Sequence, residues 1–395
     1  MTPEAPLPGV RRLRLGMVGG GTGFIGPIHA DGARLSGRWN VVAGALSSNP
    51  DKARKAGGEW GLAPDRIYVD YRDMAASEAA REDGVEAVAI TTPNANHHAA
   101  CVAFLERGID VICDKPLTTN LADALDLVAR QKKLGLIFGV TYDFASFAMV
   151  RQAREMVRAG EVGRIRQILV EFSQDWAVEP ITPDRAGQYW RIDPERAGPS
   201  FTTADLGVHA FHMASFVSGL EATELRAELF VCGADKPLED TAFVQLRFAG
   251  GVPGSLWVSQ AATGTDCNIR IRIFGDKAGL EWSHEEPDQL CFNRLNQPAQ
   301  IIKRGQGAGM AVVAERFSRI PRGNPQGWVD AWAGLYAEFA TVIAARRAGM
   351  PIPQSAVDYP NVVDGARGVK FVEAALESHR AGSAWTDCRL ELQGA

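Results

Sequence analysis

The sequence predicts an α/β protein in which a doubly wound parallel sheet is followed by an α+β domain with a large, mostly antiparallel open sheet. Three observations support this prediction. Short apolar runs alternate with helical stretches over the first 140 residues, and a glycine-rich loop directly follows the first run. After residue 145, long alternating segments follow one another with few helices between them. We place the two domains at residues 11–142 and 143–395.

Length and composition allow two domains and exclude several classes of protein. The chain has 395 residues, 46% of them hydrophobic and 23% charged, with a formal net charge of −5. A mildly acidic chain without a basic block is a poor candidate for binding nucleic acid. No apolar run is long enough for a membrane span. The six cysteines form no C-x-x-C pair and are expected to be free thiols.

The N-terminus is expected to be a loose, proline-rich tail over residues 1–10, with the first strand starting at Leu13. Arg11-Arg12 permits a twin-arginine export signal as an alternative. The apolar stretch that follows is short and runs into glycines without a cleavage site, so a cytoplasmic protein is the favoured interpretation.

In the first domain, strands are predicted at five apolar runs, residues 13–18, 41–46, 86–92, 110–113 and 136–140. The stretches between them have helical character. Four of these helices are predicted to end at a glycine, namely Gly37, Gly61, Gly108 and Gly135.

In the second domain, one helix over 147–160 precedes a series of strand-like segments. These segments are 164–176, 223–233, 241–251, 254–263 and 267–275, and 248–257 reads as a hairpin turn. An amphipathic helix is predicted over 328–349, and another helix over 362–382.

The glycine-rich loop predicts a Rossmann dinucleotide-binding site. Residues 21–26 fit G-x-G-x-x-G, follow a strand and open a helix, which is the context that the motif requires. Glycines let main-chain N–H groups approach a pyrophosphate at the start of a helix. A generic glycine turn is the alternative. The predicted cofactor contacts here are Gly19, Gly21, Thr22, Gly23, Phe24 and Ile25.

The end of the second strand leaves the choice between NAD and NADP open. An acidic residue that grips the adenosine ribose is usual at this place, about 20 residues after the loop. This chain has Ser47 and Ser48 instead. Both are predicted cofactor contacts, although they could simply cap the next turn.

Two further strand ends are predicted to border the nicotinamide half of the cofactor, because ligands bind beyond the carboxyl ends of parallel strands. They are "TTPNANHH" (91–98) and "CDKPL" (113–117). Lys115 is placed where its ammonium could stabilise a developing substrate alkoxide, although a surface lysine is the alternative. The predicted cofactor contacts from these segments are Thr92, Pro93, Asn94, His97, Asp114 and Lys115.

Three polar residues in "TTADLGVHAFHMASFVSG" (202–219) form a candidate acid–base group. Asp205, His209 and His212 are spaced four and three apart, so a helix would place them on one face. Histidine is the usual general base near neutral pH, and an aspartate can orient it. Alternatively, Asp205 caps the helix, His212 is a core histidine, or the three bind a metal.

Taken together, these motifs resemble the Gfo/Idh/MocA family of oxidoreductases over nearly the whole chain. The similarity lies in G-x-x-H (26–29), "TTPNANHH", D-K-P at 114–116 where the family usually has E-K-P, and D-x-x-x-H (205–209). It implies that Lys115 is the catalytic lysine, that the Lys115–Pro116 bond is cis, and that Asp205 and His209 are catalytic partners. It also implies homodimers or homotetramers assembled through the open sheet.

Within that family, "SQDW" (173–176) and "YWR" (189–191) are similar to members that oxidise sugars or glycosides. The resemblance places Asp175, Trp176 and Arg191 at the substrate or the nicotinamide end of the cofactor, although Trp176 could be ordinary aromatic core. Tyr142, Lys115, His209 and His212 complete the predicted substrate contacts. No metal is predicted.

Three features depart from the family pattern and predict an altered substrate pocket. The loop carries extra glycines, His212 stands where members often have aspartate, and Tyr142-Asp143-Phe144 stands in place of Y-N-Y-R.

The predicted function is an NAD(P)-dependent dehydrogenase that oxidises a ring secondary hydroxyl of a sugar, glycoside or cyclitol, or catalyses the reverse reduction. Alternatives are a non-catalytic cofactor-binding sensor or scaffold, and a metal-dependent lyase or hydrolase that uses Asp205, His209 and His212. A reductase of sugar-nucleotide or amino-sugar biosynthesis is a further option within the family. Neither nucleic acid nor a membrane is an expected partner.

Overall fold

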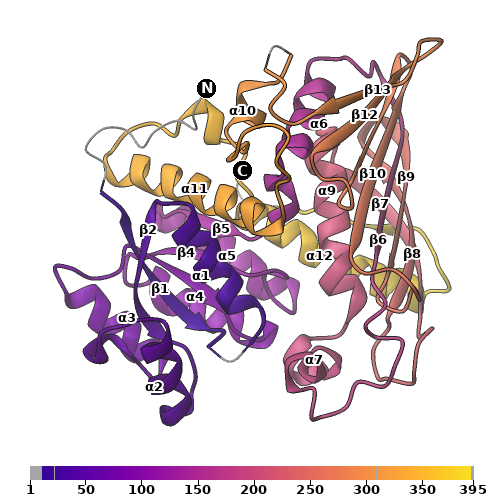
Figure 1. Ribbon diagram of the computed structural model, residues 1–395. Helices are drawn as coiled ribbons and strands as arrows, with labels where there is room; N and C mark the ends of the chain where they lie inside the picture. Colours follow the sequence, from indigo (N-terminus) through magenta and orange to yellow (C-terminus); the bar gives the residue numbers. More distant parts are fainter. Residues whose placement is uncertain (1–10, 22, 308, 393–395) are drawn as a thin grey trace. The chain divides into compact units, whose positions relative to one another are not determined.

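The computed structural model describes residues 11–21, 23–307 and 309–392 (Figure 1). The predicted tail over residues 1–10 lies outside these residues. The chain divides into two compact units. Unit 1 holds the described residues within 1–118, 122–143 and 327–365, and unit 2 holds those within 119–121, 144–326 and 366–395.

Unit 1 contains the predicted parallel sheet. Its five strands are β1 (Leu13–Gly19), β2 (Trp39–Ala45), β3 (Ala87–Thr91), β4 (Asp110–Cys113) and β5 (Phe138–Val140). Their order is β2-β1-β3-β4-β5, and every neighbouring pair is parallel. The strand order reverses at β1, so the carboxyl ends of β1 and its neighbours frame the crevice where ligands bind in such sheets.

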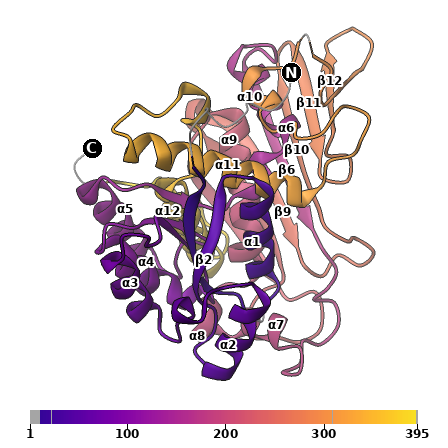
Figure 2. The ribbon, with the colours of Figure 1, turned by 60° about the vertical axis from the view of Figure 1, so that its left-hand side comes forward.

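Helices connect these strands, as the alternating sequence pattern predicts (Figure 2). They are α1 (Ile25–Leu35), α2 (Pro50–Glu59), α3 (Tyr71–Ala80), α4 (His97–Leu105) and α5 (Leu121–Leu134), with short 3₁₀ turns at Pro64–Arg66, Asn94–Asn96, Asp143–Ser146 and Gln354–Ala356. Helix α3 was not predicted. The four glycines predicted to end helices are confirmed in the left-handed region, with φ between 64° and 74°.

Helix α11 (Trp328–Arg347) belongs to unit 1, whereas the sequence prediction placed residues 143–395 in one second domain. Its side chains Trp332, Tyr336 and Phe339 join the core that β1 and β2 build with Leu15, Met17 and Trp39. The helix itself is confirmed, but its amphipathic character is not. Residues 331–336 and 338–340 are all buried, and a helix that is covered all round carries no polar face.

Unit 2 is built on a nine-stranded sheet. Its order is β13-β12-β11-β10-β6-β9-β8-β7-β14, and only the β6–β9 pair is parallel. The strands are β6 (Ile165–Ser173), β7 (Ala222–Phe230), β8 (Thr241–Phe248), β9 (Val252–Ser259), β10 (Asn268–Gly275), β11 (Ala278–Ser283), β12 (Gln289–Arg294), β13 (Gln300–Lys303) and β14 (Thr386–Asp387). The mostly antiparallel sheet and the hairpin between β8 and β9 are therefore confirmed. Strands β11 to β14 were not predicted.

One face of this sheet is covered by helices of the same unit, α6 (Ala148–Arg158) and α9 (Val208–Ser218) (Figure 1). Short helices at α7 (Ala186–Tyr189), α8 (Pro194–Ala197) and α10 (Val312–Glu315) and turns at Trp190–Ile192 and Ala249–Gly251 complete unit 2. Helix α12 (Val362–Arg380) begins in unit 1 and continues in unit 2. Strand residues alternate between the two faces: on β8, Val244 is buried whereas Phe243 and Gln245 are exposed.

All six cysteines are free thiols, as predicted. Among the described helices, none combines the length and the apolar character that crossing a bilayer requires.

Candidate cofactor and catalytic sites

The glycine loop between β1 and α1 is closed by main-chain contacts that only glycine permits. A Cβ on Gly26 would lie 2.5 Å from the main chain of Gly20, and a Cβ on Gly20 would lie 2.6 Å from Gly26. Gly20 also has a φ of +73°. The N–H of Gly21 donates to the Leu46 carbonyl at the end of β2 (3.2 Å), and the N–H of Gly23 donates to Gly20 (3.3 Å). These contacts bring the loop against the strand ends.

The loop fits the pyrophosphate of a dinucleotide. Helix α1 starts at Ile25, and its N-cap side chain is the apolar Phe24, so its first N–H groups are left to a ligand. Thr92 Oγ1 at the end of β3 is buried and has no hydrogen-bond partner among the described residues. Phe24 is 65% exposed and stacks on Trp328 of α11, with ring centroids 5.9 Å apart. Thr22, another predicted contact, lies outside the described residues.

The two serines after β2 carry no carboxylate, and their predicted cofactor contacts stay predictions. Ser47 Oγ accepts the N–H of Asn49 (3.2 Å), and Asn49 caps α2 by accepting from Asp51 and Lys52. Ser48 is exposed. The turn-capping alternative therefore describes Ser47, while the helix cap itself is Asn49.

His97 links the two strand ends that follow β3 and β4. Its Nδ1 lies 2.9 Å from the Pro116 carbonyl oxygen, and its Nε2 lies 2.9 Å from the Thr92 carbonyl oxygen. The ring is 1% exposed. A ring N–H can donate to either of these main-chain carbonyls, so the geometry supports a role for His97 in positioning the two strand ends. Its predicted cofactor contact stays a prediction. Pro93 and the buried Asn94 lie on the loop that His97 holds.

The lysine after β4 is held by its neighbours. Asp114 Oδ1 accepts the N–H of Lys115 (2.8 Å) and the hydroxyl of Thr141 (2.9 Å), and the Lys115–Pro116 peptide is cis, as predicted. His29 of α1 approaches the same carboxylate, with Nε2 3.9 Å from Asp114 Oδ1, and its Nδ1 bonds to the Tyr336 hydroxyl (2.8 Å). Burial lowers the pKa of His29 to about 4, so it is neutral at pH 7.

Asp143 is a buried carboxyl group beside the lysine segment. Trp328 Nε1 donates to Asp143 Oδ2. Burial raises the pKa of Asp143 to about 7, against the opposing effects of this hydrogen bond and of the Lys115 charge. Tyr142, next to it, is 1% exposed, and burial together with the Asp364 charge raises its pKa. A titratable group therefore stands where the family usually has asparagine.

In unit 2, Asp205 lies on a π-helical turn (Thr203–Gly207) that leads into α9. Such turns are frequent at functional sites. Gln260 Nε2 donates to Asp205 Oδ2 (2.7 Å), and Gln260 Oε1 accepts the Thr202 hydroxyl (2.7 Å). The Glu239 carboxylate accepts the N–H of Thr203 (3.0 Å), which holds the start of the turn. Gln260 is completely buried and was missed by sequence reasoning, because a glutamine at a strand end has no motif.

His209 and His212 occupy different surroundings on α9. His209 is 6% exposed and meets Phe144 and Phe172 edge to face, at centroid distances of 5.0 and 6.1 Å. His212 stacks on Phe216, and burial, followed by the charges of nearby arginines, lowers its pKa to about 3. His212 is therefore neutral at pH 7, which fits the core-histidine alternative, and its predicted substrate contact stays a prediction.

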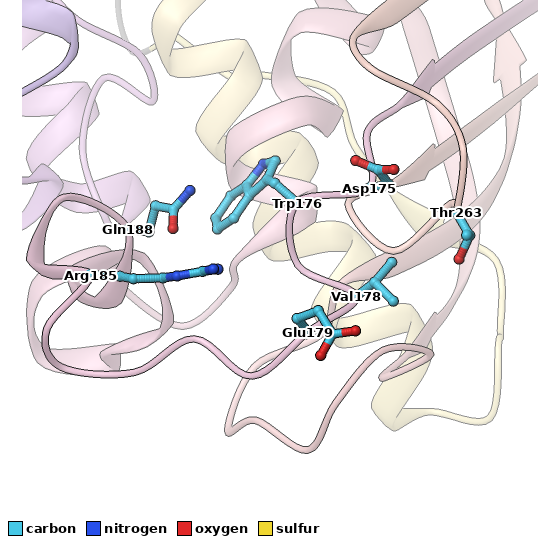
Figure 3. Close-up of a pocket in the computed structure, with 7 residues that line it drawn as sticks. All are labelled: Asp175, Trp176, Val178, Glu179, Arg185, Gln188 and Thr263. Carbon is cyan, nitrogen blue, oxygen red and sulfur yellow. The ribbon is translucent and has the colours of Figure 1, made fainter.

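A cavity of about 600 Å³ in unit 2 contains two of the predicted substrate residues (Figure 3). Its lining residues are Asp175, Trp176, Val178, Glu179, Arg185, Gln188 and Thr263. Arg191 is absent from this lining: its guanidinium donates to the Gly187 carbonyl and lies over the Trp190 ring. Arg185, which the sequence prediction did not name, is in the lining, and the predicted substrate contact of Arg191 stays a prediction.

The metal-site alternative lacks the grouping it requires. No set of three or more His, Cys, Asp or Glu side chains in the described part of the chain is arranged to hold a metal ion. Asp205, His209 and His212 therefore do not form the ligand set considered above.

A parallel sheet with a glycine loop at its switch point defines the class of protein, a Rossmann-fold oxidoreductase. Comparison with known proteins identifies the family. Residues 13–142 match "Oxidoreductase family, NAD-binding Rossmann fold", and residues 150–281 match "GFO/IDH/MocA C-terminal domain". The chain belongs to the Gfo/Idh/MocA family of NAD-binding oxidoreductases.

Relatives span almost the whole chain. The uncharacterized oxidoreductase YfiI of Bacillus subtilis is 34% identical over 95% of this chain and 96% of its own length. An inositol dehydrogenase homolog from Azotobacter vinelandii, solved with NAD+, is 35% identical with a TM-score of 0.89, covering 95% of this chain and 97% of that one. It was also solved with NADH and myo-inositol. Levoglucosan dehydrogenase of Pseudarthrobacter phenanthrenivorans is 24% identical over 96% of this chain and 98% of its length.

Replacing Gly26 with alanine is predicted to weaken NADH binding at least tenfold, because the new Cβ would lie 2.5 Å from the Gly20 main chain and force the loop open. Titration of NADH by fluorescence measures the effect. Gly58→Ala on α2 is the control, since nothing lies within 4 Å of its added Cβ. Unchanged affinity in the Gly26 variant would remove this loop from the cofactor site.

Asp143→Asn is predicted to remove part of the pH dependence of stability. The Asp143 pKa is about 7 in the folded chain and about 3.9 when unfolded, so the folded state binds more protons between these values. The free energy of unfolding of the native chain should therefore fall as pH rises from about 4 to 7, by at most about 4 kcal/mol.

Urea unfolding from pH 5 to 8 tests this. The amide introduced by D143N can still accept from Trp328 but does not titrate, so the variant should gain stability over the native chain as pH rises. Asp73→Asn removes an exposed carboxylate and controls for net charge. A difference between D143N and the native chain that is constant with pH would contradict the assignment.

Proposed function

We propose that this protein is an NAD-dependent dehydrogenase that oxidises a ring secondary alcohol of a cyclitol, sugar or glycoside. One observation carries the proposal: this family member has the full set of candidate catalytic groups. Lys115 follows β4, Asp205 lies on the π turn and His209 lies on α9. A non-catalytic sensor would have no need of these groups.

Unit 1 supplies the cofactor site and the lysine in this mechanism. Main-chain N–H groups of the glycine loop and the start of α1 hold the pyrophosphate. When bound, NAD+ would supply the hydride acceptor for the substrate carbon. The Lys115 ammonium lowers the pKa of the substrate hydroxyl and stabilises its oxygen as negative charge develops. Asp114 orients the lysine main chain through its hydrogen bond to the Lys115 N–H.

Unit 2 supplies the proton acceptor. His209 takes the hydroxyl proton as a general base, and Asp205 orients it. The hydrogen bond that the Gln260 amide donates holds the Asp205 carboxylate in place. Edge-to-face contacts with Phe144 and Phe172 fix the orientation of the His209 ring.

NAD is the proposed cofactor and a polyhydroxylated ring the proposed substrate class. Solved relatives at 34–35% identity contain NAD+ or NADH, and one of them contains myo-inositol. Neither Ser47 nor Ser48 selects against a 2′-phosphate, so the preference for NAD rests on the relatives.

Lys115→Ala is predicted to lower kcat by about 10²–10³, the usual effect of removing one group that stabilises developing negative charge. The dissociation constant for NADH should change little. Absorbance of NADH at 340 nm, with myo-inositol, aldoses, glycosides and anhydrosugars as substrates and with NAD or NADP, gives substrate class, cofactor and rate. Lys133→Ala, at an exposed position of α5, is the control.

Two results would overturn the proposal. Near-normal turnover in the Lys115 variant would remove the lysine from the mechanism. Absence of turnover with every polyol, despite measured NADH binding, would favour a reductase of a keto-sugar or a sensor.

We also propose assembly into homodimers or homotetramers through the open face of the nine-stranded sheet. Phe230 and Phe243 pair on this face, 43% and 51% exposed, with ring centroids 6.1 Å apart. Exposed aromatic pairs on a sheet face are typical of protein interfaces.

Phe243→Glu is predicted to shift the chain to monomers, because a carboxylate would replace the exposed ring. Sedimentation velocity measures the change. Leu134→Glu on α5 replaces a side chain that is 43% exposed in unit 1 and should leave the assembly intact. A native chain that is already monomeric, or an unchanged oligomer in F243E, would contradict the proposal.

A further inference from the structure

We propose that the cavity beside Trp176 is a second ring subsite, which holds the non-reacting ring of a glycoside or disaccharide while the oxidised ring lies at Asp205 and His209. This inference rests on the proposed function, because it takes that pair as the place of reaction. It narrows the substrate class to two-ring carbohydrates.

The cavity is separate from the aspartate–histidine pair but structurally joined to it. Neither Asp205 nor His209 is among its lining residues. Ala177, which directly follows Trp176, donates its N–H to the Gln260 carbonyl (2.9 Å), and the Gln260 side chain holds Asp205. A molecule that contacts both places must therefore extend beyond the reacting ring.

Trp176 is a preorganised apolar platform within this cavity. Its Nε1 donates to Gln174 Oε1 (2.8 Å), and its ring meets Phe201 edge to face at 5.4 Å. It packs on a buried cluster that includes Ile181 and Leu238, yet remains partly exposed. A ring fixed in this way offers an apolar surface to the C–H face of a sugar at little entropic cost.

Polar side chains surround this platform and keep their hydrogen-bonding capacity for a ligand. In Figure 3, Arg185 and Gln188 point toward the Trp176 ring from one side, and Asp175 and Thr263 lie on the other. In the described part of the chain, no hydrogen bond or ion pair is found for the side chains of Gln188, Glu179 and Thr263, and Arg185 interacts electrostatically with the neighbouring Asp184. They offer donors and acceptors of every kind that hydroxyl groups need.

The charge of the cavity favours a neutral polyol. Asp175 and Glu179 contribute two carboxylates against the one guanidinium of Arg185. This balance disfavours a phosphorylated or carboxylated ring.

The cavity volume of about 600 Å³ lies in the range of small-molecule sites. Glu179, Arg185 and Thr263 are exposed, so a ring here keeps one side in water, as expected for the distal part of a substrate.

The test compares one-ring and two-ring ligands on the whole chain saturated with NADH. Isothermal titration calorimetry with myo-inositol and its α-galactoside, and with glucose and cellobiose, gives the affinity ratio for each pair. At least one two-ring compound should bind about tenfold or more tightly than its one-ring partner. The same ratio should hold for kcat/KM where turnover occurs, because remote binding contributes to catalysis.

Variants test whether the tighter binding of two-ring compounds comes from the cavity. Trp176→Ala should remove the tighter binding of two-ring compounds, lowering two-ring affinity about tenfold more than one-ring affinity. Arg185→Ala should reduce it several-fold, and because Arg185 is exposed, this variant tests the subsite even if the Trp176 variant fails to fold. Tyr189→Ala, an exposed aromatic outside the lining, should preserve the ratio.

The outcomes separate the subsite from the proposed function. Affinity ratios near one in the native chain, or an equal loss of one-ring and two-ring binding in W176A or R185A, would overturn the subsite even if myo-inositol were oxidised. If W176A or R185A lost only two-ring binding while the native chain oxidised no polyol, the subsite would be supported and the proposed dehydrogenase activity overturned.

Discussion

The packing of helix α11 against helix α1 is the contact on which the cofactor half of the protein depends. A Cβ on Gly32 of α1 would lie 2.9 Å from Cβ of Trp332, so the two helices approach as closely as their main chains allow. The His29–Tyr336 hydrogen bond and the core around Trp39 and Phe339 secure this contact. It brings a segment from near the end of the chain to the glycine loop.

The consequences reach the chemistry of unit 1. Helix α11 begins at Trp328. The Trp328 indole stacks on Phe24 of the glycine loop and donates its N–H to the buried Asp143 carboxyl. The same helix places Tyr336 against His29, whose other nitrogen faces Asp114. Helix α11 thus connects the glycine loop, the lysine segment and the buried Asp143 carboxyl. The two residues of the His29–Tyr336 hydrogen bond are 307 positions apart in the chain.

In unit 2, Gln260 has a comparable role. Its buried side-chain amide connects Thr202 and Asp205, and its main-chain carbonyl accepts the N–H of Ala177, which follows Trp176.

Local signals predicted much of this arrangement. The strands of unit 1, the left-handed glycines at helix ends and the glycine loop follow from short-range patterns in which residue type dictates backbone conformation. The cis Lys115–Pro116 bond was implied by the family resemblance. Such patterns failed where contacts between distant residues decide the outcome. Helix α11 was expected to be amphipathic, but the rest of unit 1 covers most of its length. Short-range patterns also could not show that His97 lies between two main-chain carbonyls or that burial lowers the pKa of His212. They likewise did not show that Arg185 lines the cavity beside Trp176.

By itself the sequence determined the class of fold and the NAD-binding family, because glycine loops and strand–helix alternation act over a few residues. It also named the residue types of the candidate catalytic groups. Tertiary structure alone decided which groups share a microenvironment. The raised pKa of Asp143, the support of Asp205 by Gln260 and the composition of the cavity beside Trp176 depend on burial and on partners from distant segments. Desolvation and hydrogen bonding act through space, so no spacing in the sequence encodes them directly.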